Sequence, residues 1–554
     1  MKHNAAISAL LFFILTGMLF AQNDFTDIQT FIDSNITRSF VNTYFDNNRN
    51  TAALISRVNV YRKANRFNFF LKNYYSSSVT KLNRNLYRDF DNIKLTGGYD
   101  VTDKINVSVN YLGQFFSDDK TFQLKGSSSN MGYVSGIYDA VLSGSQVYSV
   151  LNAGYKAESQ YDEYGRGPSL SGEFSIYNLS FDDYIVDGRL KLGYESLDPR
   201  KKNLVYTGLY VEKSFENNAA KNTFDGVFSR IRKDFYFPAD DLSKQQFGIT
   251  NNIEKRTETI FKAYDRFDYY ATSALSFYFS LNPDFRRITK QNTYIPSASL
   301  LQPGVYDTDI QDLSISSEGA MNLQLNKLDM QLKVYYRERD EKHFLMNPER
   351  IAANFAKDIE ENEAAKNNHS QLFKLNSNFF YNINLMNRVE LTGSASILKY
   401  DTQSDVNYDD RDELGYLVYL AHRFNNLRGL ILVTSVDMNL YHTVYIYSQK
   451  SSNNNWNRVL RFTSKSYFEP GEGFRNIGTF SVLANYTVYD FEDIISSVKS
   501  YSFRQMNLKD SMIVKFTRHL GADIYGELKY YERGELNWGE FSQRPVNYYE
   551  DKII

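Results

Sequence analysis

Residues 105–111 read Ile-Asn-Val-Ser-Val-Asn-Tyr, a strict alternation of apolar and polar side chains. Successive side chains of a β-strand point to opposite faces of a sheet, so this period of two indicates a strand with one apolar and one polar face. The same phase continues through Gly113 and Phe115. Residues 93–99 carry the same alternation, and the mostly polar stretch 100–104 between the two segments predicts a β-hairpin.

The alternation recurs through the rest of the chain. It is clear at 313–325 and 328–336, at 373–383 and 389–397, and near the end at 522–530. The polar phase of these segments carries Lys, Glu, Asp, Asn and Gln, which suits a water-filled lumen better than a packed core. A soluble propeller or a pair of sandwiches is the alternative, but no repeat of about 40 residues, which a propeller requires, is visible.

The connections between the alternating segments differ in length. Short ones are predicted at 282–284, 326–327, 384–388, 425–428 and 517–519, and long polar ones at 338–370, 401–413 and 448–457. Short periplasmic turns on one rim and long extracellular loops on the other are typical of outer-membrane barrels. Closure of such a sheet leaves no unpaired backbone in lipid. We therefore predict an all-β fold, a large up-and-down antiparallel transmembrane β-barrel.

The size of this barrel follows from the number of segments. Carrying the alternation along the chain gives about 22 to 24 strands, or about 18 if the weaker segments are omitted, and bacterial barrels favour even numbers. A barrel of this size encloses an aqueous lumen or requires a plug.

The N-terminus has the pattern of a secretory leader. Lys2 and His3 precede an apolar stretch at 5–20, and Ala21 is the small residue expected before a cleavage point. A transmembrane anchor is the alternative, but it needs about 20 apolar residues, and the polar pair 23–24 follows here instead of basic residues. The chain is therefore expected to be exported.

The leader and the alternation together predict the domain organisation. We expect a signal peptide at 1–21, a short periplasmic segment at 22–30 and a barrel at 31–554, located in the cell outer membrane. Segment 22–30 is too short for a folded plug domain, so any plug would come from loops that fold inward or from a partner chain.

Composition excludes several classes of protein. The 554 residues carry 63 Lys+Arg and 65 Asp+Glu, a formal net charge of -2, which provides no general field for nucleic acid. Cysteine is absent, which excludes disulfides, thiolate metal sites and a cysteine nucleophile. Only 42% of residues are hydrophobic, too few for a polytopic helical membrane protein, while the 16% aromatic content suits the two aromatic girdles of a barrel.

The chain resembles the outer-membrane β-barrel proteins of Gram-negative bacteria, and its leader, ending Phe20-Ala21-Gln22, is similar to those common in the Bacteroidetes. The resemblance covers nearly the whole chain after the leader and rests on the diffuse alternation, so it assigns no subfamily. The N-terminal plug and energy-coupling box of TonB-dependent receptors are not visible. The last residues, 548–554, lack the terminal aromatic residue usual in such barrels. An unusual last strand and a truncated sequence both explain this departure.

No catalytic constellation is evident. The sequence has no His-Glu-x-x-His, no Gly-x-Ser-x-Gly and no phosphate-binding Gly-rich loop. His442 lies in the apolar phase of its segment, where a lipolytic role would need a neighbouring Ser and an orienting Asn or Asp. An interfacial histidine without a catalytic role is the simpler interpretation. We therefore predict no enzyme activity, no catalytic residues and no cofactor.

Two loops carry candidate sites. In the first, Asp405, Asn407 and Asp409 have the alternate spacing of a calcium loop, but Asp410 and Tyr416 stand where such a loop has Gly and a bidentate Glu. They are weak candidates for Ca²⁺, and a solvated extracellular loop is the alternative.

In the second, Asn347-Pro348-Glu349 has the residues of a helix start, with Asn as N-cap and Pro at the first position, and a helix is predicted through Lys366. Its acidic residues are candidates for a lid folded into the lumen; they are Asp358, Glu360, Glu361 and Glu363. The alternative is a surface decoration. The basic tract 200–203, after Pro199, is interpreted as a solvated turn at one rim.

These patterns predict a channel or transport component that passes a polar solute, possible examples being a small molecule or a saccharide, through the lumen. The alternative is a surface binding or adhesion protein that uses the barrel as an anchor. Outer-membrane lipid is the expected surrounding partner, and the sequence indicates neither nucleic acid nor any particular protein partner.

Overall fold

The computed structural model describes residues 39–47, 51–81, 85–118, 126–215, 218–295, 305–426, 428–492, 494, 499–517, 520–535 and 546–553. The leader at 1–21 and the segment at 22–30 lie outside the described residues.

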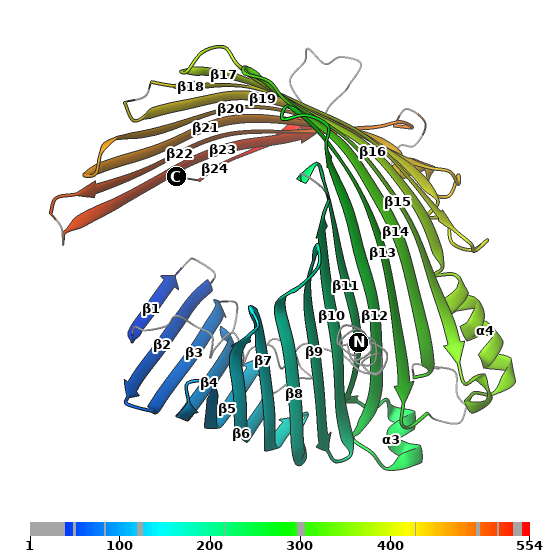
Figure 1. Ribbon diagram of the computed structural model, residues 1–554. Helices are drawn as coiled ribbons and strands as arrows, with labels where there is room; N and C mark the ends of the chain where they lie inside the picture. The colour runs from blue at the N-terminus through cyan, green and yellow to red at the C-terminus, as the bar shows by residue number, and fades with distance from the viewer. Residues whose placement is uncertain are drawn as a thin grey trace.

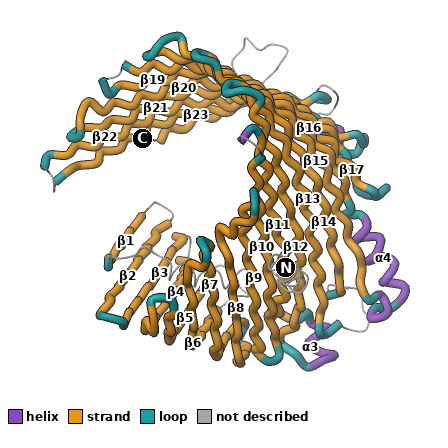
Figure 2. Tube along the Cα trace, in the orientation of Figure 1, coloured by secondary structure: helices purple, strands orange, loops and turns teal. Residues whose placement is uncertain are grey.

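The described chain forms a single 24-stranded antiparallel sheet (Figures 1 and 2). The strands of the first half are β1 (Phe40–Asn47), β2 (Thr51–Ala64), β3 (Phe67–Lys81), β4 (Asn85–Thr102), β5 (Ile105–Asp118), β6 (Ser127–Leu142), β7 (Ser145–Gln160), β8 (Glu163–Phe181), β9 (Tyr184–Leu197), β10 (Arg200–Ser214), β11 (Ala220–Pro238) and β12 (Asn251–Tyr270). Those of the second half are β13 (Leu275–Asn292), β14 (Asp307–Gln324), β15 (Leu328–Met346), β16 (Asn368–Asn382), β17 (Asn387–Thr402), β18 (Arg411–Asn425), β19 (Leu430–Tyr445), β20 (Asn455–Gly471), β21 (Phe474–Tyr489), β22 (Tyr501–Lys515), β23 (Gly521–Glu535) and β24 (Val546–Ile553).

Each strand pairs with the next one along the chain, which confirms the predicted up-and-down topology and a strand number within the predicted range. The sheet curls around a wide hollow, and β1 and β24 are its two edges among the described residues (Figure 1). We call the concave side of the sheet the lumen face and the convex side the outer face.

Among the described residues, the helical segments with defined bounds are few and short. They are α3 (Asp241–Phe247), α4 (Ala353–Ala364) and the 3-10 turns η2 (Pro348–Arg350) and η3 (Ser451–Asn453). All four lie in connections on the same rim of the sheet, since each follows an odd-numbered strand. No helix among the described residues is long and apolar enough to cross a membrane.

The two rims differ as the sequence predicts. Connections after even-numbered strands are short turns, such as 65–66, 182–183 and 325–327, whereas those after odd-numbered strands include the long segments 239–250 and 347–367. We call these the short-turn rim and the long-loop rim.

The short link predicted at 282–284 is wrong. These residues lie inside β13, where Pro283 pairs with Ile315 of β14. On the other side, the ladder to β12 passes from Asp284 to Leu281 without a partner for Asn282 or Pro283. A proline has no N–H to donate, so it fits where a ladder is interrupted. The Asn-Pro-Asp tract therefore marks a local irregularity within a strand.

Alternation along β5 gives the two faces of the sheet, which forms the wall of the barrel, different side chains. The odd-numbered apolar residues point outward, and Val109 is 66% exposed on the outer face. The even-numbered Ser108 and Asn110 point to the lumen face and are buried among other polar side chains. An apolar outer face with a polar lumen face is the pattern of an outer-membrane β-barrel, because the outer face meets hydrocarbon. The chain is accordingly an outer-membrane protein.

Candidate functional site

A chain of amide and hydroxyl side chains crosses neighbouring strands on the lumen face. Asn110 of β5 donates a hydrogen bond to Ser135 of β6 over 3.1 Å. Ser135 donates in turn to Asn152 of β7, and Asn152 donates to Ser171 of β8 over 2.9 Å. Each of these groups therefore has a partner within the wall, which stabilises a polar surface that faces the hollow.

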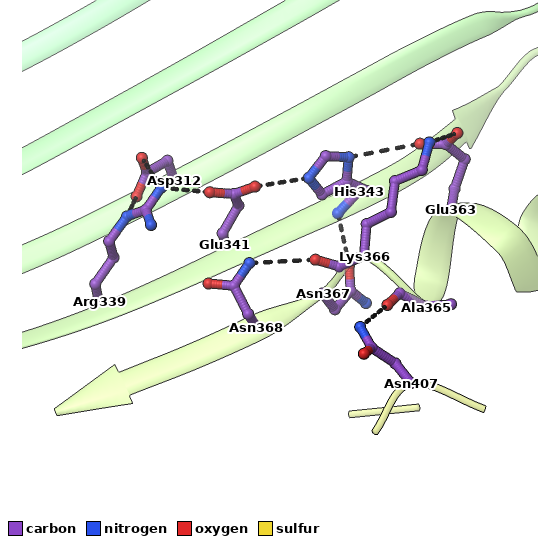
Figure 3. Close-up of polar contacts among 10 residues, drawn as sticks. All are labelled: Asp312, Arg339, Glu341, His343, Glu363, Ala365, Lys366, Asn367, Asn368 and Asn407. Atoms are coloured by element: carbon purple, nitrogen blue, oxygen red, sulfur yellow. Dashed lines mark hydrogen bonds and ion pairs between the residues drawn. The ribbon is translucent and has the colours of Figure 1, made fainter. Parts of the chain in front are cut away.

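Charged side chains form a second row, along β15 (Figure 3). Residues 339, 341 and 343 are two apart, so they share the lumen face. Arg339 donates two hydrogen bonds to Asp312 of β14, both 2.9 Å long, in a bidentate pair. Its guanidinium also donates to Glu341, and Glu341 lies 2.8 Å from Nε2 of His343. We call Asp312, Arg339, Glu341 and His343 the charged row.

The charged row ends at the C-terminal turn of α4. Oε2 of Glu363 lies 3.5 Å from Nδ1 of His343. The other oxygen of Glu363 accepts hydrogen bonds from Lys366 and, over 2.8 Å, from the hydroxyl of Tyr306. Glu363 is buried, so this carboxylate ties α4 to the lumen face of the wall.

The structure separates the four acidic lid candidates. Asp358, Glu360 and Glu361 are exposed, and only Glu363 is buried against the charged row. In Figure 1, α4 lies beside the end of β15 and away from the hollow that the sheet encloses. The three exposed acids are therefore placed on the rim, and Glu363 is the one that reaches the lumen face.

The single helix predicted from Asn347 is wrong. Asn347 precedes only the 3-10 turn η2 and makes no side-chain capping bond, because its own backbone is left-handed, with φ of 50°. A second helix, α4, then begins at Ala353. The side chain of Asn347 instead donates over 2.7 Å to Asp307, which is also paired with Arg350. This contact to the wall competes with capping and breaks the helix in two.

Burial of Glu363 works to raise its pKa, but the hydrogen bonds from Lys366 and Tyr306, with the charges of Lys366 and His343, outweigh burial and leave the pKa below its ordinary value. Burial and the bond to Glu363 raise the pKa of Tyr306 to about 12. At neutral pH the Tyr306 hydroxyl therefore stays protonated and the Glu363 carboxylate stays ionised, as their hydrogen bond requires.

A pH-dependent detachment of α4 is expected from this contact. Because the folded-state pKa of Glu363 is lowered, its stabilisation is complete above the ordinary carboxyl pKa and is lost as the pH falls from there through the lowered value. The chain has no cysteine, so a spin label on Asp358→Cys reports α4 alone. We expect label mobility to rise as the pH falls below the ordinary carboxyl pKa of about 4.3. With Glu363→Gln added, the rise should vanish; an identical rise in both proteins would contradict the role of Glu363.

At another arc of the long-loop rim, the β9–β10 hairpin folds over the lumen face of β8. The pairing of β8 with β9 ends at Ser169 and Glu195. Beyond it the backbone of β9 lies against Gly167, where an added Cβ would sit 1.7 Å from the carbonyl oxygen of Ser196. A Cβ on Gly165 would likewise be 2.9 Å from the carbonyl oxygen of Leu197. The two glycines thus permit a backbone approach that any other residue would obstruct.

The folded hairpin brings charges from β9 and β10 to β7. Glu195 is 3.0 Å from the ammonium of Lys156, and Arg200 donates over 2.8 Å to Glu158. Lys156 and Glu158 also pair, at 3.1 Å. Arg200 is 2% exposed, and its guanidinium lies 4.8 Å from the centre of the Tyr236 ring. Buried ion pairs of this kind depend on every partner being present.

A cavity of about 260 Å³ lies beside this cluster on the lumen face. Its charged lining residues are Lys156, Arg200, Lys201, Lys202 and Lys233, with Glu158, Glu195 and Asp234. Basic side chains therefore outnumber acidic ones around it. We call it the rim cavity.

The sequence did not identify the rim cavity. The tract 200–203 was expected to be a solvated turn, and this interpretation is wrong, because Arg200 and Lys202 begin β10 and are buried. The visible signal was the pair Gly165 and Gly167 in a polar strand, which indicates a close backbone approach. The segment that approaches these glycines, at Ser196 and Leu197, cannot be identified from spacing along the chain.

The structure gives two of the calcium candidates other partners. Asp409 pairs with Lys450 of the next long loop. Asn407 accepts from the backbone of Asp409 over 3.1 Å and donates to the carbonyl of Ala365 over 2.9 Å. Asp405 is exposed. Among the residues that the structure describes, no group of three or more His, Cys, Asp or Glu is arranged to hold a metal ion.

His442 lies on the outer face near the long-loop rim. Its ring stacks on Trp456, with centres 4.2 Å apart, and its Nε2 is 2.9 Å from the carboxylate of Asp490. The register places Leu414 and Trp456 opposite it on the neighbouring strands. None of these neighbours is a serine that could act as a nucleophile. The contacts of His442 instead fix its ring against Trp456.

Comparisons with known proteins match this chain to solved structures but to no protein family. No protein-family model matches the chain, and no curated protein matches it. The ferric yersiniabactin uptake receptor FyuA from Yersinia pestis is 10% identical, with a TM-score of 0.43, over 89% of this chain and 74% of that one. The ferric citrate transporter FecA is 10% identical, with a TM-score of 0.40, over 87% and 78%. The copper transporter OprC is 9% identical, with a TM-score of 0.42, over 91% and 75%. Likeness at this level carries no argument about a site or a solute.

Proposed function

We propose that this protein passes a polar solute across the outer membrane through the lumen of its barrel. The observation that carries the proposal is the lumen face itself, where hydroxyl, amide and charged side chains of both signs line the hollow. An outer face rich in exposed apolar residues accompanies it. A wall that served only as an anchor would not need charged side chains on the concave side, since burying charge is costly unless every group is paired.

The proposed orientation places the long-loop rim outside the cell, because long loops of such barrels are extracellular. The rim cavity and the end of the charged row then lie where a solute first enters. The solute class consistent with this lining is a polar small molecule or a saccharide.

Ion and solute flux test the proposal. We expect the folded full chain to make planar bilayers conduct and vesicles permeable to small polar solutes. An added lumen charge, Asn439→Arg, is expected to shift the reversal potential toward that of the anion, because Asn439 lies on the lumen face of β19. A folded protein without conductance or flux would contradict transport.

That negative result would favour the second candidate function, a surface protein that binds through its loops. The observation in its favour is that α3, α4, η2 and η3 all lie on the long-loop rim. Loops held by such local structure commonly carry binding residues.

A further inference from the structure

We propose that Arg200 binds a carboxylate or phosphate group of the solute in the rim cavity, through the edge of its guanidinium formed by Nε and Nη2. The inference rests on the proposed function and deepens it, since it gives the solute a chemical class: a small organic oxyanion.

The hydrogen bonds of Arg200 leave one edge of the guanidinium for a ligand. Nη1 donates to Glu158 over 2.8 Å and lies 3.4 Å from Gln160. Nε and Nη2 are buried and have no hydrogen-bond partner among the described residues. A buried donor without a partner costs free energy, and a charged one costs more.

Other arginines of the same wall show what this edge binds. Arg339 uses Nε and Nη2 to hold both oxygens of Asp312, and Arg232 uses the same two atoms to hold Asp234. Arg266 holds both oxygens of Asp268 in the same way, Oδ2 through Nε and Oδ1 through Nη2. The edge fits a planar pair of oxygens in a bidentate arrangement, which carboxylates and phosphates supply. Among the described residues, no carboxylate occupies the corresponding edge of Arg200.

The surroundings hold Arg200 in place for such a ligand. Its guanidinium is stacked near the ring of Tyr236 and paired with Glu158, which fixes the plane and leaves little side-chain entropy to be lost on binding. Lys156 is already paired with Glu158 and Glu195. The charge balance of the cavity lining remains positive, which attracts an anion and repels a cation.

The size of the cavity limits the ligand. Its volume of about 260 Å³ lies just below the range of about 300–1,000 Å³ found for pockets that hold drug-sized molecules. It therefore suits a small oxyanion, or the anionic end of a longer solute whose remainder lies in the hollow.

Calorimetric titration of the detergent-solubilised full chain with succinate and with inorganic phosphate tests the proposal. We expect the parent to bind at least one of them. Arg200→Gln should weaken binding by about 10- to 100-fold, the range expected for hydrogen bonds to a charged group. Arg200→Lys keeps a positive charge beside Glu158 but removes the two-atom edge, so it too should weaken binding by at least about tenfold.

The matched control is Arg266→Gln. Arg266 lies on the same lumen face, 4.0 Å from the ring of Tyr278, and its edge is already held by Asp268. This variant removes the same charge and should bind as the parent does. The relative strength of the succinate and phosphate titrations distinguishes a carboxylate solute from a phosphate one.

Three results would overturn the proposal: a folded parent that binds neither probe, an Arg200→Lys protein that binds as tightly as the parent, or equal weakening by Arg266→Gln. The shift of gel mobility on heating identifies folded material, and if Arg200→Gln fails to fold, Arg200→Lys decides. Binding is measured without a membrane, so a failure here is distinct from an absence of conductance, which would contradict transport alone.

Discussion

Arginine in place of Met438 is expected to destabilise the folded barrel by about 2–4 kcal/mol, the cost of a basic side chain at the middle of a lipid-facing strand. Met438 lies halfway along β19 and is exposed on the outer face. The residues opposite it on the neighbouring strands, Val418 and Leu460, are also exposed and apolar. A charge there would face hydrocarbon with no partner.

The neighbouring position supplies the control. Asn439 points to the lumen face, so Asn439→Arg places the same side chain in water and should cost less than about 1 kcal/mol. Urea unfolding from lipid vesicles, followed by the mobility of unheated samples on gels, measures both variants. Equal stabilities for the two proteins would show that both faces of β19 meet the same solvent. The assignment of the outer face to lipid would then fail.

Alanine in place of Gly167 is expected to displace the β9–β10 hairpin. The added Cβ would meet the backbone carbonyl of Ser196, which cannot rotate away as a side chain can. Moving the hairpin separates Glu195 and Arg200 from their partners on β7. Breaking a buried pair costs about 3–5 kcal/mol, so amide exchange in residues 196–203 should accelerate by a factor of roughly 100 or more.

The corresponding control is Gly132→Ala on β6, where an added Cβ meets nothing within 4 Å. We expect exchange in 196–203 to stay unchanged in that variant, and the anion titration to match the parent. If Gly167→Ala also leaves both measurements unchanged, the backbone contact over β8 does not hold the hairpin, and the rim cavity loses its structural basis.

The fold could be predicted from the sequence because its signals are local. The alternation at 105–111 determines which face each residue of β5 occupies, and the turn at 326–327 is short because β14 and β15 pair directly. Where prediction failed, a distant contact overrode the local signal. Asn347 has the side chain of an N-cap but bonds to Asp307 across a loop. Pro283 has the look of a turn but fits an interrupted ladder within β13.

The candidate site was harder to predict for the same reason. Arg200 follows a proline in a basic tract, which is the usual pattern of a solvated turn. Its burial depends on Gly165, Glu158 and Tyr236, which lie on three other strands. Of the acidic residues of α4, Glu363 is set apart by its contacts with Tyr306 and His343, in addition to its bond from the nearby Lys366. Neither Tyr306 nor the partners of Arg200 on other strands could be identified from sequence spacing.

The inward fold of the β9–β10 hairpin also sets the height of the bilayer against the wall. Beyond Ser169, residues 163–168 of β8 have no ladder partner on β9 among the described residues. Peptide groups lacking a ladder survive where water can hydrate them and are too costly in hydrocarbon. We therefore expect the lipid boundary to run below the level of Ser169, which would place the rim cavity in the aqueous layer above the acyl chains.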